Sequence, residues 1–149
     1  MLIVNKDIFA SIGEYDAIAV TTNGIVKSNG RLVMGAGIAK QFAIRYPTLP
    51  SVLGEKVKHY GNIPFLIKEK GVSIISFPTK NHYSEKSSLE LIESSAKKIK
   101  NLADKFYWTK VGIPAPGVGL GGLSWKKEVQ PLLSPIFDDR FIIHFYKGK

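Results

Sequence analysis

The chain has 149 residues, of which 44% are hydrophobic and 22% charged, a composition typical of one globular domain and not of a disordered or repetitive chain. It carries 21 basic and 12 acidic residues, a formal net charge of +9, so we expect an anionic partner, with a merely soluble basic surface as the alternative. The absence of cysteine excludes disulfides, thiolate catalysis and cysteine-ligated zinc.

Membrane and export signals are not evident in the sequence. No stretch approaches the roughly 18 consecutive apolar residues of a membrane span, and the opening segment reaches Lys6 and Asp7 too early for a secretory signal. We therefore expect a cytoplasmic protein with no membrane partner. The three histidines, His59, His82 and His144, are scattered along the chain, so we also expect no metal and no cofactor.

In the first half of the chain, short apolar runs alternate with helical patterns. In chain order they predict strands at 2–4 and 17–20 and helices at 38–46 and 48–60. The second strand is apolar throughout, which indicates that both of its faces are covered. In the first helix, hydrophobic residues recur every four positions from Ile38 to Tyr46, and Pro47 ends the pattern.

The second half of the chain continues this alternation. It predicts a hairpin of strands 65–67 and 72–77, a helix over about 88–103, a strand at 111–115, a helix from about Ser124 to Pro135, and a last strand at 141–146. The run from Ser87 to Glu90 has the spacing of a capping box at the start of the first of these helices. Strands alternating with helices, with one antiparallel hairpin, predict an α/β fold with a mixed sheet between helix layers.

Two glycine-rich segments each lie between a predicted strand and a predicted helix, at 33–38 and 116–123. Glycine lets backbone N–H groups approach an oxyanion, and the following helix N-terminus favours negative charge. Because ligands of open α/β sheets bind at the carboxyl ends of strands, two such loops predict a site for the paired phosphates of a nucleotide. The spacing matches neither a P-loop nor a dinucleotide fingerprint, and tight turns are the alternative interpretation.

Several segments resemble the macro domain family. Asp7-Ile8, the run from Asp16 to Asn23 and the run from Val33 to Ala39 are similar to the family's conserved segments, and the resemblance covers essentially the whole chain. Segments 77–82 and 117–125 look most like the branch of DNA and terminal protein ADP-ribosyl glycohydrolases, with ADP-ribose-1''-phosphate phosphatases as near relatives. The resemblance implies one macro domain over 1–149, a three-layer α/β/α fold with a mixed central sheet of about six strands.

The same resemblance implies a cleft that binds ADP-ribose. Asp7 would accept from the adenine amino group beside the Ile8 amide, Phe145 would lie against the adenine, and Asn23 would bond the distal ribose. The loops would hold the distal ribose and the diphosphate through Met34, Gly35, Ala36, Gly37, Ile38, Gly117, Val118, Gly119, Leu120, Gly121, Gly122 and Leu123. Ordinary alternatives exist: Asp7 as a helix cap, Asn23 as a turn residue and Phe145 as core.

Lys80 is the catalytic residue that the resemblance implies, engaging the anomeric carbon of the ADP-ribosyl group. It follows the strand at 72–77, although most of the 18 lysines must be ordinary surface charges. Gly121 stands where the terminal protein ADP-ribosyl glycohydrolases have an acidic residue, and Leu120 stands where the DNA ADP-ribosyl glycohydrolases have an asparagine. In the run from Asp16 to Asn23, Val20 stands where the family has its first asparagine. If the acid is essential, the chain either binds without cleaving or cleaves only a linkage with a good leaving group. His82 is a candidate for proton transfer, with a surface or core histidine as the alternative.

The expected function is an ADP-ribose-binding hydrolase that removes ADP-ribosyl groups from a macromolecule. Nucleic acid is favoured over protein as the acceptor, because the net charge of +9 attracts a polyanion. The alternatives are a non-catalytic ADP-ribose reader and an ADP-ribose-1''-phosphate phosphatase.

Overall fold

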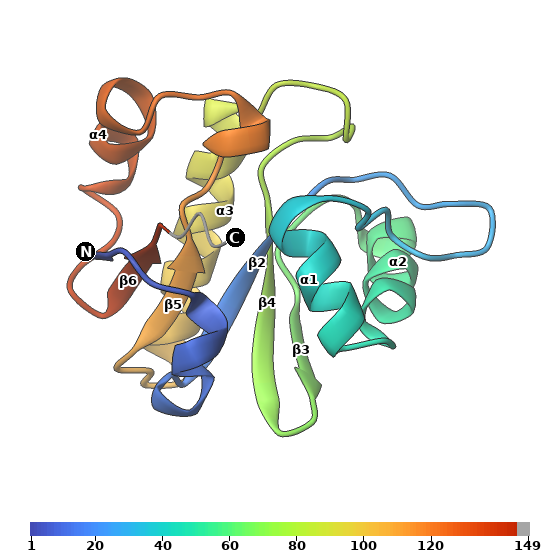
Figure 1. Ribbon diagram of the computed structural model, residues 1–149, viewed down its shortest axis with the longest axis horizontal. Coiled ribbons are helices and arrows are strands. Elements are labelled where there is room, and N and C mark those ends of the chain that lie inside the picture. Colours follow the sequence, from blue (N-terminus) through green and yellow to red (C-terminus); the bar gives the residue numbers. More distant parts are fainter. Residues whose placement is uncertain (146–149) are drawn as a thin grey trace.

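Six strands form one mixed sheet at the centre of the fold (Figure 1). The computed structural model describes residues 1–145, so Tyr146 of the predicted last strand lies outside the described residues. The strands are β1 (Leu2–Val4), β2 (Ala17–Thr22), β3 (Leu66–Glu69), β4 (Val72–Pro78), β5 (Val111–Pro114) and β6 (Phe141–His144). Their order is β1-β6-β5-β2-β4-β3, parallel except for β3, which pairs antiparallel with β4. The predicted α/β class and mixed sheet are confirmed.

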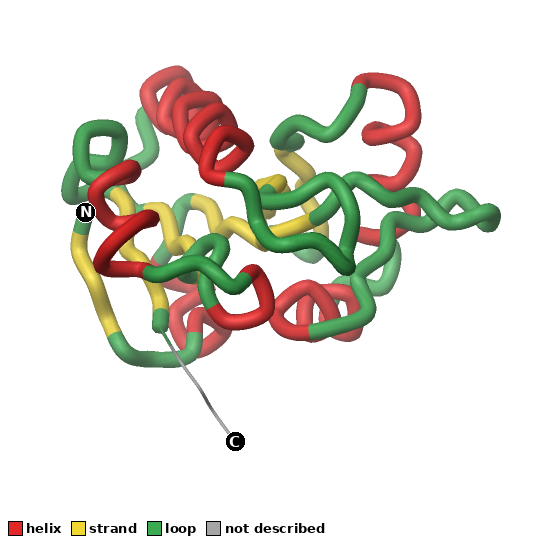
Figure 2. Tube along the Cα trace, turned by 90° about the horizontal axis from the view of Figure 1, so that it is seen from above, coloured by secondary structure: helices red, strands yellow, loops and turns green. Residues whose placement is uncertain are grey.

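Helices cover both faces of this sheet (Figure 2). One face packs against the 3-10 helix η1 (Ile8–Glu14), α1 (Gly37–Arg45) and α2 (Leu49–Tyr60), and the other against α3 (Leu89–Lys105), the π-helical turn η3 (Trp125–Val129) and α4 (Gln130–Leu133). In β2, Ala17 and Ala19 belong to the core beside α3, whereas Ile18 and Val20 belong to the core beside α1. This alternation explains why β2 is apolar from Ala17 to Val20, and it confirms the three-layer architecture.

Two turns differ from the sequence prediction. The hairpin turn between β3 and β4 contains only Lys70 and Gly71, with φ of 52° and 75°, because the strands extend further than predicted. At the start of α3, the N-cap is Ser88, whose hydroxyl accepts from the Leu91 amide, so Glu90 stands one position too early to complete a capping box. That part of the prediction was wrong by one residue.

The last helical segment begins as predicted and ends slightly early. Ser124 is its N-cap, accepting from the Lys127 amide at 3.2 Å, and Glu128 accepts from the Ser124 amide at 2.9 Å. The first turn is π-helical, and α4 ends at Leu133, just before Pro135. Pro131 lies where the π-helical turn passes into α4.

The parallel strands place chemically useful residues along one edge of the sheet. The segments that follow β1, β6, β5, β2 and β4 all leave from the carboxyl ends of parallel strands, which lie at the same edge. Segments far apart in sequence therefore meet there, including both glycine-rich loops. Within residues 1–145, no helix is long and apolar enough to cross a membrane.

Candidate functional site

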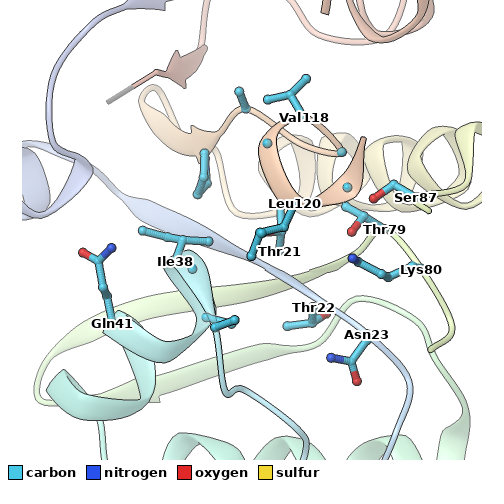
Figure 3. Close-up of a pocket in the computed structure, with 18 of the residues that line it drawn as sticks. Thr21, Thr22, Asn23, Ile38, Gln41, Thr79, Lys80, Ser87, Val118 and Leu120 are labelled. Atoms are coloured by element: carbon cyan, nitrogen blue, oxygen red, sulfur yellow. The ribbon is translucent and has the colours of Figure 1, made fainter. Parts of the chain in front are cut away.

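A cleft of about 1190 Å³ lies along the carboxyl edge of the sheet (Figure 3). Small-molecule sites usually measure about 300–1,000 Å³, so this cleft is large enough for a dinucleotide-sized ligand. The predicted site residues that line it are Asp7, Ile8, Asn23, Met34, Gly35, Ala36, Gly37, Ile38, Lys80, Gly117, Val118, Gly119, Leu120, Gly121 and Phe145. The structure thus brings both loops and the lysine to one site.

Two predicted ligand residues lie outside the cleft lining, Gly122 and Leu123. Leu123 is only 9% exposed and packs in the core beside α3, and its amide donates to the Gly117 carbonyl at 2.9 Å. Gly122 has φ of 76° and donates its amide to the Gly119 carbonyl at 3.1 Å. Both residues therefore close the second loop on itself.

The charged residues of the cleft lie at its two ends. Among the cleft-lining residues, only Asp7 and Lys80 have side chains that carry a full charge at neutral pH. Asp7 follows the edge strand β1, whereas Lys80 follows β4, and β6, β5 and β2 lie between these two strands. The uncharged glycine-rich loops occupy the middle of the cleft.

The first glycine-rich loop, residues 34–38, leads into α1. Gly37 begins this helix with φ of 57°, a left-handed value that favours glycine. The N-cap Ala36 supplies no side-chain cap, and the first turn contains no acidic residue. The N–H groups of Ala36, Gly37 and Ile38 donate to no other described residue. These free amides, together with the helix dipole, can bind an anion.

The second glycine-rich loop, residues 117–123, needs glycine for backbone conformation and for space. Gly117 and Gly119 have φ of 77° and 65°, and a Cβ at Gly117 would lie 2.7 Å from Cδ1 of Ile92. The N–H groups of residues 118–120 donate to no other described residue. This loop therefore offers a second set of free amides to the same cleft.

The two loops approach each other through one side chain. Leu120 is 72% exposed, and a Cβ at Gly37 would lie only 3.3 Å from its Cδ1. Figure 3 shows the Leu120 side chain directed from the second loop toward Ile38. The two sets of amides consequently lie on facing sides of the cleft.

Asp7 uses one carboxylate oxygen within the protein. Its Oδ1 accepts from the Phe9 amide at 3.0 Å, which makes Asp7 the N-cap of η1, as the alternative interpretation predicted. The residue also lines the cleft, and its Oδ2 accepts no hydrogen bond from another described residue. Capping and ligand recognition are therefore compatible at this carboxylate.

The Asn23 side chain holds the backbone that follows β2. Its Oδ1 accepts from the Ile25 amide at 2.9 Å and its Nδ2 donates to the Val33 carbonyl at 3.0 Å, so the turn interpretation describes its present contacts. A primary amide has two N–H donors and two lone pairs on its oxygen. One donor and one lone pair therefore remain for a ligand in the cleft that Asn23 lines.

Lys80 stands just beyond the end of β4 with its backbone held in place. Its carbonyl accepts from Nδ2 of Asn62 at 3.1 Å, and its Nζ donates to the Tyr83 carbonyl at 3.4 Å. Figure 3 shows the amine in the cleft near the hydroxyl groups of Thr79 and Ser87. The lysine thus lines the cleft, with its side chain partly exposed.

Two other predicted side chains differ in their relation to the cleft. Phe145 lines it and packs edge-to-face against Trp125, with 5.0 Å between ring centroids. His82 does not line it, and its Nδ1 lies 2.8 Å from the Ser84 hydroxyl. Within residues 1–145, no cluster of three or more His, Cys, Asp or Glu side chains is arranged to hold a metal ion.

His144 is a cleft residue to which the sequence analysis assigned no function. Its Nε2 lies 2.6 Å from the Tyr15 hydroxyl and its Nδ1 lies 2.9 Å from the Lys6 carbonyl. Because a carbonyl only accepts, Nδ1 carries the proton and Nε2 accepts from the tyrosine. His144 thereby ties β6 to the segment that positions Asp7. Burial lowers the pKa of His144 below its ordinary value, and the hydrogen bond to Lys6 opposes this.

We expect this histidine to make the protein less stable at mildly acidic pH. Below about pH 6.5, the ordinary pKa, the unfolded chain protonates His144 whereas the folded chain, with its lowered pKa, does not. The unfolded state then binds more protons, so the free energy of unfolding falls as pH falls until the folded pKa is passed. Urea titrations at pH 7.5 and 5.5 measure the free energy of unfolding, and the difference between the two pH values should be smaller for His144→Gln than for the unmodified protein. Equal differences in both proteins would contradict it.

Ser87 is a second cleft residue that the sequence analysis interpreted differently. It is 7% exposed, and its buried Oγ has no hydrogen-bond partner among the described residues. Its amide donates to the Gly121 carbonyl at 2.9 Å, and a Cβ at Gly121 would collide with the Ser87 hydroxyl. The serine therefore occupies the space that a side chain at position 121 would need.

We expect substitutions at these two positions to be strongly coupled. Gly121→Ala should lower the free energy of unfolding by about 1–3 kcal/mol through overpacking. Ser87→Ala should be neutral or stabilising, because it removes a buried hydroxyl that lacks a partner. In the double variant the penalty at position 121 should shrink. Denaturation of all four proteins gives the coupling free energy, and additive effects would contradict the expectation.

Comparison with known proteins links this cleft to a family. No family model matches the chain. The DNA ADP-ribosyl glycohydrolase of Mycobacterium tuberculosis is 32% identical over 131 residues, covering 82% of this chain and 37% of that protein. A DNA ADP-ribosyl transferase-DNA ADP-ribosyl glycohydrolase fusion protein of Thermosipho africanus is 29% identical over 154 residues, which cover 88% of this chain and 37% of that protein. The chain thus spans 37% of the length of these curated relatives.

Solved structures agree with the sequence comparison. The macrodomain of Mycobacterium tuberculosis DarG has a TM-score of 0.77 and 26% identity, covering 96% of this chain and 97% of the other. Thermosipho africanus DarTG in complex with ADP-ribose has a TM-score of 0.82 and 26% identity, and the match covers 99% of this chain and 42% of the other. The resemblance indicated by the sequence motifs is confirmed, and the chain belongs to the macrodomain family.

Proposed function

We propose that this chain binds ADP-ribose in the cleft and hydrolyses the bond that joins the distal ribose to DNA. The observation that carries the proposal is the order of groups along the cleft: the Asp7 carboxylate, two loops with free amides, and the Lys80 amine. ADP-ribose presents an adenine, a diphosphate and a ribose in the same order. The names of the relatives similar in sequence support the reaction and the DNA acceptor.

Each part of the ligand meets groups of suitable chemistry in this arrangement. The free Oδ2 of Asp7 accepts from the adenine amino group, with Phe145 against the ring. The amides of the two loops donate to the diphosphate. The remaining N–H of Asn23 donates to the distal ribose, whose anomeric carbon then lies at the Lys80 end of the cleft.

Lys80 is the residue to which we assign the chemical step. The Lys80 amine, once it has given up a proton, attacks C1'' of the distal ribose, and the bond from C1'' to the DNA acceptor breaks with its electron pair on the acceptor, which takes up a proton. Water then hydrolyses the bond between lysine and ribose, releasing ADP-ribose and the free amine. Asn62 holds the Lys80 backbone through its carbonyl, and the Nζ donates to the Tyr83 carbonyl at 3.4 Å.

The charge of the protein favours a nucleic-acid acceptor. The net charge is +9, and Asp7, at the far end, is the only acidic residue among those lining the cleft. A strand of DNA brings one phosphate per nucleotide to the Lys80 end, and its attraction should weaken steeply with salt.

Substrate comparison tests the proposal. The protein is incubated with an ADP-ribosylated single-stranded oligonucleotide, an ADP-ribosylated protein and ADP-ribose-1''-phosphate, and released ADP-ribose is quantified. We expect release mainly from the oligonucleotide, and calorimetry should detect binding of ADP-ribose. Absence of ADP-ribose binding would overturn the whole proposal, and release only from protein or phosphate ester would overturn the DNA acceptor.

A non-catalytic ADP-ribose reader is the second candidate function. It is favoured by the second loop, where Gly121 and Leu120 provide neither a carboxylate nor a side-chain amide. A reader would bind ADP-ribose in calorimetry and release none from any of the three substrates.

A further inference from the structure

An exposed aromatic side chain lies beside the amine end of the cleft. Tyr83 lines the cleft and is nevertheless 53% exposed. Its carbonyl accepts from Nζ of Lys80 at 3.4 Å, so the two residues are direct neighbours. A group attached to the anomeric carbon that Lys80 engages would therefore lie near Tyr83.

A second ring supports the tyrosine. The His82 ring stacks on Tyr83, with 4.2 Å between centroids and 30° between planes. The histidine is itself held, because its Nδ1 lies 3.1 Å from the Ser84 amide and its own amide donates to the Glu85 carboxylate at 3.1 Å. The pair therefore presents a backed aromatic surface whose orientation is set before a ligand arrives.

The segment that carries these rings is attached to the fold at both ends. Before the rings, the Asn81 carbonyl accepts from the Gly24 amide at 3.0 Å and its Oδ1 accepts from Asn62 Nδ2 at 2.9 Å. After them, the Ser88 amide donates to the Thr79 carbonyl at 2.8 Å. Tyr83 is thus held in a fixed relation to Lys80.

The surroundings of the aromatic pair suit an anionic partner. Neither Lys80 nor Lys86, which flank it in sequence, forms an ion pair with a carboxylate of the described chain. A free aromatic surface next to unpaired cations is the combination by which proteins bind single-stranded nucleic acid without reading its sequence.

We propose that Tyr83, backed by His82, stacks on the nucleobase to which the ADP-ribosyl group is attached. The inference rests on the proposed function and adds the contact that recognises the acceptor. Free ADP-ribose and ADP-ribose-1''-phosphate carry no base at the anomeric carbon, so Tyr83 discriminates between a nucleic-acid acceptor and these smaller ligands.

Binding measured without turnover tests the stack. In a Lys80→Ala background, fluorescence anisotropy follows binding of an ADP-ribosylated single-stranded oligonucleotide, and calorimetry follows ADP-ribose and ADP-ribose-1''-phosphate. Tyr83→Ala should weaken oligonucleotide binding by about 5–150-fold, the range for loss of one base–aromatic stack. It should change the affinity for ADP-ribose and for ADP-ribose-1''-phosphate by less than about twofold. Tyr83→Trp should retain oligonucleotide binding.

A matched control removes an exposed tyrosine elsewhere. Tyr107 follows α3, is 88% exposed and does not line the cleft, so Tyr107→Ala should leave all three affinities unchanged. Equal losses for all ligands in Tyr83→Ala would overturn the inference, as would unchanged oligonucleotide binding. Failure of the proposed function would give a different result. The Lys80→Ala parent would then bind neither ADP-ribose nor the ADP-ribosylated oligonucleotide, or the unmodified protein would release no ADP-ribose.

Discussion

Lys80→Ala should lower the rate of ADP-ribose release from DNA by at least about 10³-fold, because it removes the attacking nucleophile, while ADP-ribose still binds. The Lys80 side chain supplies the only amine among the cleft-lining residues, and the groups that would hold adenine and diphosphate lie elsewhere in the cleft. Single-turnover release from an ADP-ribosylated oligonucleotide measures the rate, and calorimetry measures binding.

Two further variants separate chemistry from charge. Lys98→Ala removes the same charge from the exposed surface of α3 and should behave as the unmodified protein. Lys80→Arg keeps a positive charge but provides no nucleophilic amine, so it should be as slow as Lys80→Ala. Full activity of Lys80→Arg would assign Lys80 to electrostatic stabilisation, and full activity of Lys80→Ala would remove it from the mechanism.

Gly54→Ala should lower the free energy of unfolding by about 3 kcal/mol, at the upper end for overpacking. Gly54 lies in α2, and a Cβ there would collide with the Gly30 carbonyl and lie 2.9 Å from the Leu32 amide nitrogen. These are backbone atoms, which cannot rotate aside, and the Leu32 amide is bonded to the Pro50 carbonyl at 2.9 Å. The melting temperature should fall by roughly 6–12 °C.

Gly54→Ala should also weaken ligand binding in the cleft. The segment displaced by a larger residue 54 continues into Val33, which accepts from Asn23, and then into the first glycine-rich loop. We expect weaker ADP-ribose binding in calorimetry at a temperature where Gly54→Ala is still folded. Gly13→Ala is the matched control, since a Cβ there meets nothing within 4 Å and should change stability by less than about 0.5 kcal/mol. Equal melting temperatures in the two variants would contradict the packing argument.

Strong local patterns made most of the sheet predictable from the sequence. Continuous apolar runs mark β2 and β6 because both faces of each are covered, and the two-residue turn at Lys70 and Gly71 lies inside the predicted hairpin. The cap of α3 was misplaced because Ser87 and Ser88 are equally good caps in isolation. Their amides bond to Gly121 and Thr79, residues far along the chain, and such contacts are not visible in a local pattern.

The residues of the candidate site could be predicted from the sequence only where they belong to a recognisable motif. The glycine-rich segments identify the two loops, and the resemblance to macro domains, carried in part by the run from Asp16 to Asn23, adds Lys80. Tyr83 and His144 belong to no motif, and Ser87 was assigned to a capping box. The contacts of Ser87 with Gly121 and of His144 with Lys6 join residues that are far apart in the sequence. Gly122 and Leu123 belong to the second motif by sequence but lie outside the cleft lining, since the loop folds back on itself there.

Under the proposed function, the anchoring of Asp7 to the Phe9 amide would affect the thermodynamics of adenine recognition. A free surface carboxylate samples several rotamers and loses that freedom when a ligand fixes it. Asp7 is already confined when the cleft is empty, so selection of adenine requires little further ordering of the side chain. Discrimination at this end of the cleft should accordingly have a small entropic penalty and be expressed mainly in the enthalpy of binding.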